Sequence, residues 1–596
     1  MSLKHWLPCT DWLRGYDRAA AGQDALAAVI VTLMLVPQSL AYAMLAGLPP
    51  IAGLYASILP LLAYALFGSS RTLAVGPVAV VSLMTASTLQ PLFPAGSAEY
   101  ASAALLLALL SGLLLAGMAV LRLGFLANFL SHPVISGFIS ASGLLIACGQ
   151  LKHLLGVQAG GDTLPELLPS LVQHLPSLVQ HLPSLNPTTL LIGGLSLLWL
   201  WWARSRAKAT LLRLGLPAGL ASALARAAPA LAIVVAILAV SLLGLGAHGV
   251  KVVGDIPSGL PSFTLPSLDP ALAAKLLPSA LLISLVGFVE SVSVAQTLAA
   301  TRRQRIGPDN ELLGLGAANV AAAFSGGFPV TGGFARSVVN HDAGAQTPLA
   351  GVMTAGGIAL GTLLLTPLLH ELPQAVLAAT IIVAVLSLVD LGSLLRTWRY
   401  AWQDGAAQLA TMAGVLLMGV ESGILLGVGL SLLLFLWRTS RPHMAVVGQV
   451  PGSEHFRNVE RHAVNESPTV LSLRVDESLY FPNARYLEER IVELIAQRPQ
   501  VRHLVLMCSG VNLIDASALD SLEAIVERLR ASDVQLHLSE VKGPVMDQLG
   551  RSTFLRTFGG QVFLSQYQAL KTLAPDSLQE PAPHHPCVAH LPRRSP

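Results

Sequence analysis

Phe324-Ser-Gly-Gly-Phe-Pro-Val-Thr-Gly-Gly-Phe-Ala-Arg-Ser-Val-Val-Asn340 is the stretch that decides the fold of this chain. It lies between long apolar runs, so we place it at membrane depth, but its glycines and proline do not suit one continuous helix. Irregular backbone survives at that depth only where protein buries it or where it lines a watery cavity. We therefore expect a helix to begin near Phe334 and to direct its N-terminus, with Arg336 nearby, at a bound anion.

The composition of the whole chain is that of a polytopic membrane protein. The 596 residues have a mean hydropathy of +0.64, and only 12% of them are charged. The formal charge of +3 is small for this length and gives no reason to expect a nucleic acid partner. The four cysteines are far apart and show neither metal-ligand spacing nor a disulfide framework. The residues show no nucleophile–base pair, so we expect no enzyme, metal or cofactor.

A second irregular stretch, Arg71-Thr-Leu-Ala-Val-Gly-Pro-Val78, lies in the first half of the chain. It is an extended, β-branched piece, then Gly-Pro, then a short helical run to about Leu89. We expect Pro77 in the first turn of that helix, where its missing N–H costs nothing. Two interrupted segments in corresponding halves are the best sequence indication of a transporter binding site. Val75, Gly76 and Pro77 are therefore expected to face the stretch around Arg336 across the anion.

The remaining apolar runs are about long enough to cross a bilayer. They occupy residues 25–46, 51–67, 101–121, 125–149, 189–203, 229–245, 276–300, 309–325, 347–369, 374–390, 404–420 and 422–437. Together with the two broken segments they make about fourteen membrane elements, in two sets of about seven. Because each set holds an odd number of spans, two sets in series must have opposite orientation, which predicts an inverted repeat.

Basic residues place both termini in the cytoplasm. If the N-terminus is cytoplasmic, the loops on that side contain Arg71, Arg122, Arg204, Arg206, Lys208, Arg213, Arg226, Arg302, Arg303, Arg305, Arg396, Arg399, Arg438 and Arg441. The opposite loops contain Lys152, Lys251 and Lys275. This asymmetry follows the positive-inside rule, and an error of one span in the count would have scrambled it.

Three polar side chains inside the spans are candidates for function. Gln38 and Tyr42 are four residues apart on one helical face, so they either line a cavity or bond to neighbouring helices beside a Pro37 kink. Glu290 lies about mid-span, where a carboxylate is costly and is a functional hypothesis by default. Burial disfavours its charged form, so it can exchange protons near neutral pH, unless it is a structural group bonded to another helix.

A heptapeptide is duplicated between two spans, as Leu168–His174 and Leu175–His181. The repeated His174 and His181 suggest a metal site, but a recent duplication in a tolerant outer loop explains them better.

From about Met444 the composition changes to that of a small α/β domain. Strands are predicted at 469–475, 503–507 and 534–538, and helices at 483–497, 515–530 and from 545. Asp515 is a suitable N-cap for the second helix. Residues after about 575 are rich in proline and histidine and are predicted to be disordered.

The order of these motifs resembles the SulP anion transporters, which include sulfate permeases, bicarbonate transporters and prestin. The matching residues are 36–55 (VPQSLAYAMLAGLPPIAGLY), 74–77 (AVGP), 288–291 (FVES) and 332–337 (GGFARS), followed by a STAS domain. The resemblance implies a membrane transporter domain at 25–440 and a cytoplasmic STAS domain at 445–572. A cytoplasmic segment at 1–24 precedes them, and a disordered tail at 573–596 follows them.

The resemblance also implies a fold and a site. The fold is a seven-plus-seven inverted repeat, split into core and gate domains, with broken third and tenth spans. The anion lies between the broken spans, where Gln38, Tyr42, Phe334, Ala335 and Arg336 line the pocket. An elevator-like movement of the core and a homodimer in the cell (inner) membrane are further expectations.

Two departures from the family pattern bear on chemistry. Many members have Ser where this chain has Ala335, so a hydroxyl donor is missing and backbone N–H groups and Arg336 remain. Glu290 resembles the acid of the proton-coupled sulfate permeases, whereas a sodium-coupled bicarbonate transporter has Asp. The STAS loop reads Asp515-Ala-Ser-Ala518, which leaves Ser517 as the candidate regulatory site for an unidentified protein or nucleotide partner.

We therefore predict proton-coupled uptake of a small inorganic oxyanion, with sulfate as the first choice. The alternatives are bicarbonate or dicarboxylate transport, coupled to sodium or protons, and anion exchange. A nucleobase permease is disfavoured because such proteins use acids in the tenth span and lack a STAS tail. A membrane-anchored signalling scaffold is disfavoured because an anchor needs neither Glu290 nor two broken spans.

Overall fold

The protein divides into two compact units, Met1–Ser431 and Leu432–Pro596. The computed structural model describes residues 7–129, 131–155, 163–167, 169, 186–217, 221, 224–225, 228–254, 257, 259–364 and 366–580. His174 and His181 of the duplicated heptapeptide lie outside these residues, as does the predicted disordered tail from residue 581. Residues 573–580, which were predicted as part of that tail, are described, and Gln579 exchanges hydrogen bonds of 2.8 and 2.9 Å with Gln449.

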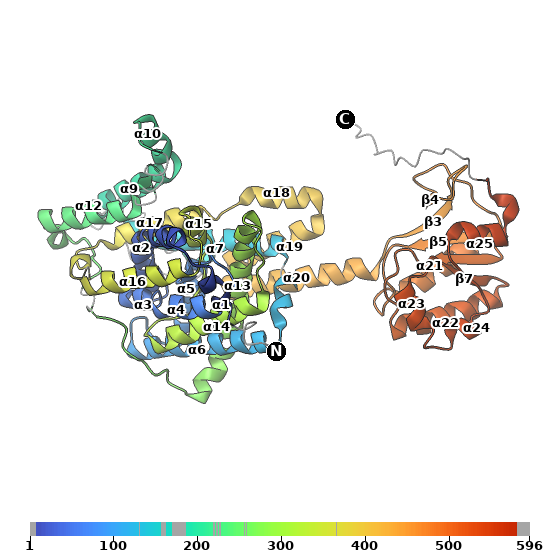
Figure 1. Ribbon diagram of the computed structural model, residues 1–596, viewed down its shortest axis with the longest axis horizontal. Helices are drawn as coiled ribbons and strands as arrows, with labels where there is room; N and C mark the ends of the chain where they lie inside the picture. Colours follow the sequence, from blue (N-terminus) through green and yellow to red (C-terminus); the bar gives the residue numbers. More distant parts are fainter. Residues whose placement is uncertain are drawn as a thin grey trace. The chain divides into compact units, whose positions relative to one another are not determined.

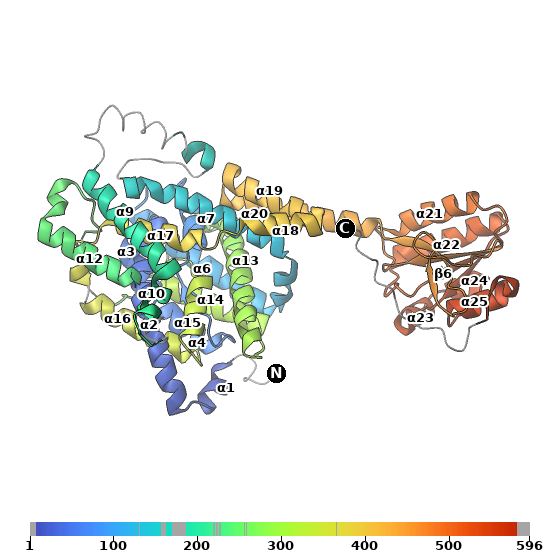
Figure 2. The same cartoon turned by 90° about the horizontal axis from the view of Figure 1, so that it is seen from above.

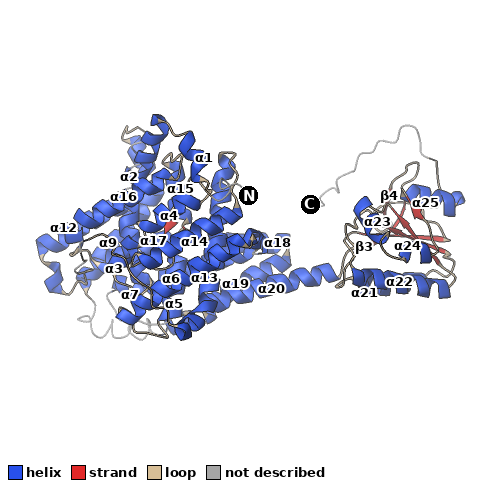
Figure 3. Ribbon diagram, turned by 60° about the horizontal axis from the view of Figure 1, so that its bottom comes forward, coloured by secondary structure: helices blue, strands red, loops and turns tan. Residues whose placement is uncertain are grey.

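Unit 1 is almost wholly helical, and in Figure 3 only a short red strand element interrupts its blue helices. Its helices are α1 (Cys9–Arg14), α2 (Arg18–Leu45), α3 (Pro50–Tyr55), α4 (Leu59–Phe67), α5 (Ala79–Leu89), α6 (Ala98–Val120), α7 (His132–Leu155), α9 (Pro187–Trp202), α10 (Lys208–Arg213), α12 (Ala228–Leu243), α13 (Pro270–Thr301), α14 (Pro308–Phe324), α15 (Phe334–Asp342), α16 (Leu349–Leu364), α17 (Gln374–Leu386), α18 (Leu391–Tyr400) and α19 (Trp402–Met418) (Figure 1). The next helix, α20 (Val420–Ser440), extends across the division between the units. Among the described residues, seven helical stretches are long and apolar enough to cross a membrane.

The predicted runs correspond to helices, with local differences. The run at 51–67 is two helices, α3 and α4, separated by a turn at residues 56–58. Pro37 is inside α2, which continues through it as one helix. The last two runs are separated at Gly419, whose φ of +91° lies in the region that favours glycine.

The helices of unit 1 form two packed groups. In one, α14 packs against α4, α6 and α13, and α2 packs against α3, α15 and α16. In the other, α7 packs against α9, α17 and α19, and Figures 1 and 2 show α9, α10 and α12 together at one side of the unit. The groups meet where α2 contacts α12 and α17 and where α5 contacts α7. The first group contains both irregular stretches.

The two irregular stretches meet in a short antiparallel ladder, which we call the crossing. Strand β1 (Val75–Gly76) pairs with β2 (Thr331–Gly332), with Val75 opposite Gly332 and Gly76 opposite Thr331. The backbone N–H of Gly333 extends the ladder by donating to the carbonyl of Ala74 at 3.2 Å. The ladder satisfies backbone groups that a break in a helix would otherwise leave unpaired.

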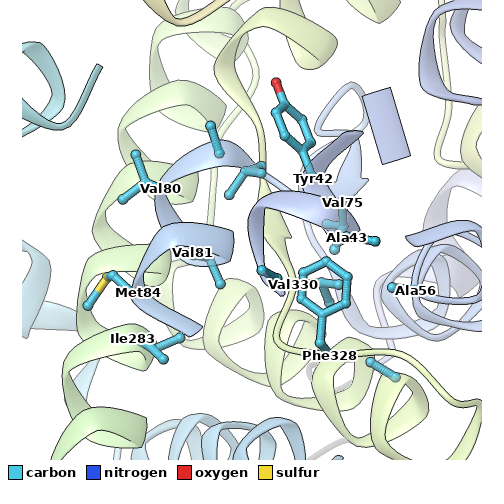
Figure 4. Packing of buried hydrophobic residues seen from close by; sticks show 14 of the residues in the cluster. Tyr42, Ala43, Ala56, Val75, Val80, Val81, Met84, Ile283, Phe328 and Val330 are labelled. Carbon is cyan, nitrogen blue, oxygen red and sulfur yellow. The ribbon is translucent and has the colours of Figure 1, made fainter. Parts of the chain in front are cut away.

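The crossing is embedded in the apolar core of unit 1. Figure 4 shows Val80, Val81 and Met84 of α5 packed beside Ile283 of α13, and Phe328 close to Val75. All six are at most 4% exposed. Such dense packing fixes the position of a backbone that has few regular hydrogen bonds of its own.

Unit 2 has a six-stranded sheet in the order β4-β3-β5-β6-β7-β8. The strands are β3 (Met444–Gln449), β4 (Phe456–Asn458), β5 (Val470–Val475), β6 (His503–Met507), β7 (Gln535–Ser539) and β8 (Val562–Phe563), and the helices are α21 (Ala484–Ala496), α22 (Ala516–Ala531), α23 (Gly543–Leu549), α24 (Phe554–Thr557) and α25 (Gln566–Leu573). Strands β5 to β8 are parallel, and β3 and β4 join antiparallel. The predicted strands and helices are confirmed, and the prediction missed β3, β4, β8, α24 and α25.

Candidate functional site

Strand β2 is held by two hydroxyl groups in a directed chain of hydrogen bonds. Thr331 Oγ1 donates to the carbonyl of Gly287 at 2.7 Å. With that proton used, Ser291 Oγ donates to Thr331 Oγ1 at 2.7 Å, and it accepts from the N–H of Gly332 at 2.8 Å. Helix α13 therefore fixes β2 through the residue next to Glu290.

The segment before β2 is held by one amide side chain of α14. Asn319 Oδ1 accepts from the N–H of Val330 at 2.9 Å, and Asn319 Nδ2 donates to the carbonyl of Val330 at 2.8 Å. Asn319 thus satisfies both backbone groups of a buried residue that has left the helical pattern.

Helix α15 holds the first irregular stretch with its own side chains. Ser337 Oγ accepts from the N–H of Ala74 at 3.0 Å and donates to the carbonyl of Gly333 at 2.7 Å. One turn later, Asn340 Nδ2 donates to the carbonyl of Thr72 at 3.0 Å. These cross-links join segments that are more than 250 residues apart in sequence.

Arg336 lies across the crossing and is only 2% exposed. Its Nη2 donates to the carbonyl of Pro77. Among the buried polar atoms of the described residues, its Nη1 is one that has no hydrogen-bond partner. Nη1 lies so close to Gly76 that a Cβ there would be 2.7 Å from it. A buried guanidinium with one free donor is costly and is suited to an anionic partner.

The two short helices begin without side-chain caps. Neither Val78, which precedes α5, nor Gly333, which precedes α15, makes a side-chain cap hydrogen bond. Orphan N–H groups at such helix starts, together with the helix dipole, favour an anion. Pro77 was expected in the first turn of α5, but this is wrong, because the helix begins at Ala79. Its buried carbonyl is instead the acceptor for Arg336.

One cavity of about 380 Å³ reaches the start of α15, and we call it the open cavity. Gln38, Phe334 and Ala335 are in its lining, which brings three of the predicted site residues together. The facing walls come from α9, α10, the π-helical turn Ala203–Ala207 between them, α12 and α17, and Arg204 and Lys208 are part of them. The cavity therefore lies between the two helix groups and has two basic side chains in its wall.

Tyr42 and Glu290 complete the set of predicted residues in unit 1. Tyr42 is 8% exposed and Glu290 is 9% exposed. Each is near enough to Arg336 for a direct electrostatic interaction, and Tyr42 and Glu290 also interact with one another. Figure 4 shows the Tyr42 ring directed away from the apolar packing around Phe328. An acid, a phenol and a guanidinium thus share one buried environment.

Ser517 is in unit 2 and is exposed in the first turn of α22. The predicted N-cap Asp515 is confirmed, since its Oδ1 accepts from the N–H of Ala518 at 2.8 Å. The other oxygen of Asp515 accepts from the N–H of Phe481 at 2.9 Å, which orders the loop around Ser517.

The residues that sequence reasoning missed are those that hold the backbone: Asn319, Thr331, Ser337 and Asn340. Ser291 was noticed only as a neighbour of Glu290. The usable signal was a single amide or hydroxyl in an otherwise apolar run, which usually bonds a neighbouring segment in a membrane. Asn319 in Gly-Ala-Ala-Asn-Val-Ala-Ala is the clearest case.

Comparisons with known sequences agree with this architecture. A model of the sulfate permease family matches residues 22–411, and a STAS domain model matches residues 461–569. The chain is 35% identical over 583 residues to sulfate transporter 4.1, chloroplastic, of Arabidopsis thaliana, covering 94% of this chain and 82% of that relative. It is 33% identical over 564 residues to a probable sulfate transporter of Mycobacterium tuberculosis, covering 94% and 96%.

Solved structures share the fold at lower identity. The murine Solute Carrier 26 family member A9 anion transporter in the inward-facing state has a TM-score of 0.87 and 21% identity, covering 96% of this chain and 94% of that one. The transmembrane domain of the cyanobacterium bicarbonate transporter BicA has a TM-score of 0.58 and 22% identity, covering 68% of this chain and 98% of that one.

Proposed function

Because this chain belongs to the sulfate permease family and carries a STAS domain, we propose that it is a secondary active transporter of a small inorganic oxyanion, with sulfate first. The family consists of integral membrane transporters, and the relatives named as sulfate transporters align with nearly all of the chain. No enzymatic activity is needed to explain any residue of the candidate site.

The observation that carries the proposal is the free Nη1 donor of Arg336 at the crossing. An anion that leaves water needs replacement donors, and two uncapped helix starts next to a buried guanidinium supply them. We assign Gln38, Tyr42, Phe334, Ala335 and Arg336 to the substrate site, together with the backbone of Val75, Gly76 and Pro77. Because most of these donors are neutral, binding is weak enough for release.

We assign the coupling of transport to Glu290. When this side chain is ionised, its negative charge opposes a divalent anion near Arg336; when it is protonated, that repulsion is removed. Proton and sulfate would then bind together and be released together. Glu290→Gln mimics the protonated form, so sulfate uptake into proteoliposomes should lose its dependence on the pH gradient. Uptake that remains driven by the gradient in this variant would refute the coupling role.

The arrangement of the membrane domain is also part of the proposal. We place about fourteen membrane elements in two inverted sets of seven, with β1–α5 and β2–α15 as broken spans three and ten. The transporter domain is 25–440, the STAS domain is 445–572, and both termini are cytoplasmic in the cell membrane. Two helix groups that meet along α2 are suited to an elevator-like movement of one group against the other. We expect a homodimer.

The substrate assignment is tested by uptake of radiolabelled sulfate, bicarbonate and fumarate into proteoliposomes, with and without a pH gradient and with and without sodium. Sulfate uptake that requires an inward proton gradient supports the proposal. Sodium-dependent bicarbonate uptake, fumarate uptake, or sulfate movement only in exchange for an internal anion would each replace it with the corresponding alternative.

A further inference from the structure

A second, much smaller pocket lies on the same helix seam as the open cavity. It measures about 20 Å³ and is lined by α2, α7 and α17, with Gln150 and His153 of α7 and Gln374 of α17 as its polar residues. We call it the closed pocket. Its volume is close to that of one water-sized probe, so it has no room for an oxyanion in this conformation.

The closed pocket and the open cavity lie along the same face of α2. On α2, the open cavity is lined by Met34 and Gln38 and the closed pocket by Ala41 and Leu45, a spacing of four, three and four that keeps one helical face. On α17 (Gln374–Leu386), a spacing of four and three links closed-pocket residues Leu377 and Ile381 to open-cavity residue Ala384.

The two spaces therefore follow one another along the contact between α2 and α17, which we call the seam. From Met34 to Leu45 the seam is about 16 Å long at 1.5 Å per residue. Ala41, Leu377 and Ile381, which line the closed pocket on this seam, are each at most 3% exposed.

The closed pocket is polar where the seam is apolar. Gln150 is 7% exposed, and Gln374 and His153 are partly buried. His153 is near enough to Lys152 and Lys251 to interact with both electrostatically. These lysines are two of the three basic residues predicted on the side opposite the cytoplasm. Two amides and an imidazole thus gather at an otherwise apolar seam, where Gln374 Nε2 donates to the carbonyl of Val252 at 3.3 Å. Lys152 is half-buried and Lys251 is exposed, and both lie outside the pocket lining.

We propose that Gln150, His153 and Gln374 form a second anion-contact site, where the oxyanion is taken up or released on the side opposite the open cavity. The inference rests on the proposed transport function. Amide and imidazole N–H groups are neutral donors that bind an oxyanion weakly, while Lys152 and Lys251 raise the local anion concentration. When α2 and its group slide along α17, the apolar residues of the seam separate, and the open cavity and closed pocket exchange roles.

Side-specific labelling of introduced cysteines tests the path. All four native cysteines are replaced by serine, and Ala378→Cys and Ala384→Cys are then made separately in the full chain. Both positions are on α17, one in the closed pocket and one in the open cavity. A membrane-impermeant maleimide is applied to intact cells and to inverted vesicles, with and without sulfate and a pH gradient.

We expect Ala384→Cys to label in inverted vesicles, and Ala378→Cys to label only in intact cells and several-fold faster while sulfate is turning over. Labelling of both positions from the same side would overturn the proposal. An Ala378→Cys variant that still transports sulfate but is not labelled by the maleimide would also overturn it. Uptake by the native chain reports the transport function itself. Side-specific labelling without sulfate uptake would therefore rule out sulfate as the substrate and still support the proposed path.

Kinetics of a second variant keep the test independent of the cysteine series. His153→Leu should raise the KM for sulfate presented to intact cells roughly threefold, because a donor at the outer contact is lost, and leave the KM in inverted vesicles unchanged. Lys275→Gln is the matched control, since Lys275 is the third lysine of that side and is exposed outside the pocket. Equal KM shifts on both sides, or no shift with His153→Leu, would contradict the role of His153.

Discussion

The two segments that meet at the crossing have the same backbone plan and opposite chemistry. Each has a two-residue strand followed by a helix without a side-chain cap. At the third residue of the helix, α5 has Val81, which is packed in the apolar core, and α15 has Arg336, which is equally buried. The first segment thus presents main-chain groups to the site, and the second adds a charge.

The direction of the hydrogen bonds shows the same division. Arg336, Ser337 and Asn340 of α15 bond to backbone groups of the first irregular stretch, at Pro77, Ala74 and Thr72. In a pair of similar folds, one copy therefore carries the side chains that organise both. We expect this asymmetry to be functional.

The largest effect is expected for Arg336→Ala. The variant removes the one charge of the crossing and leaves the Pro77 carbonyl without its donor. Truncating a buried, hydrogen-bonded charge costs about 2–5 kcal/mol, so the Kd for sulfate should rise by at least about 30-fold. Binding is measured by calorimetry on purified protein, and uptake is measured in proteoliposomes.

Two further variants separate charge from geometry. Arg336→Lys keeps the charge but cannot supply the planar pair of donors. If it binds sulfate normally, Arg336 only sets the local field. Arg71→Ala removes an exposed arginine from the start of the first stretch, and it should bind sulfate as the native chain does. A comparable loss with Arg71→Ala would break the asymmetry between the segments.

A large but smaller effect is expected for Gly76→Ala. The added Cβ would be 2.7 Å from Arg336 Nη1 at a φ of +154°, where side chains are rarely tolerated. We expect sulfate uptake to fall roughly tenfold, since a strain of about 1–3 kcal/mol falls on the guanidinium.

The counterpart Gly332→Ala meets the side chain of Leu73 at 2.7 Å but has no positive φ, so its loss should be milder. Gly117→Ala on α6 meets nothing within 4 Å and is the neutral control. If Gly332→Ala is as damaging as Gly76→Ala, close packing at the crossing, rather than the position of Arg336, accounts for both.

The two segments also show which features of the fold could be predicted from the sequence. Both were recognisable from glycine and proline inside apolar surroundings, and the start of α15 at Phe334 is confirmed. The alternation of strands and helices in unit 2 predicted its α/β class, because the period of apolar residues differs between the two elements. Short edge strands such as β4 and β8 carry too few residues for any period to be detected.

What could not be predicted was which polar side chain bonds which backbone group. The link from Ser337 to Ala74 spans 263 positions, and no local pattern contains it. Gln38, Phe334 and Ala335 share a cavity only because α2 and α15 pack together. Pro77 was misplaced because a proline suits both the first turn of a helix and the extended residues before it.

A moderate effect is expected for Ser291→Ala. Its hydroxyl accepts from the N–H of Gly332 and donates to Thr331, so the variant leaves a buried N–H of β2 unpaired. The cost should be about 1–3 kcal/mol, seen as a lower melting temperature of the purified protein and a few-fold loss of uptake. Ser293→Ala, two residues away and exposed, should change neither. Equal melting temperatures for the two variants would mean that α13 does not hold β2.

The smallest effect is expected for Ala335→Ser. Ala335 lines the open cavity at the second residue of α15, so a hydroxyl there adds one donor beside Arg336. A net hydrogen bond contributes about 0.5–1.5 kcal/mol, which corresponds to a roughly two- to tenfold lower Kd for sulfate by calorimetry. Ala79→Ser places the same group in the first turn of α5, where it is 6% exposed and packed in the apolar core. It should not tighten binding, because only the second segment presents side chains to the anion; an equal gain from both variants would show that the two helix starts are chemically equivalent.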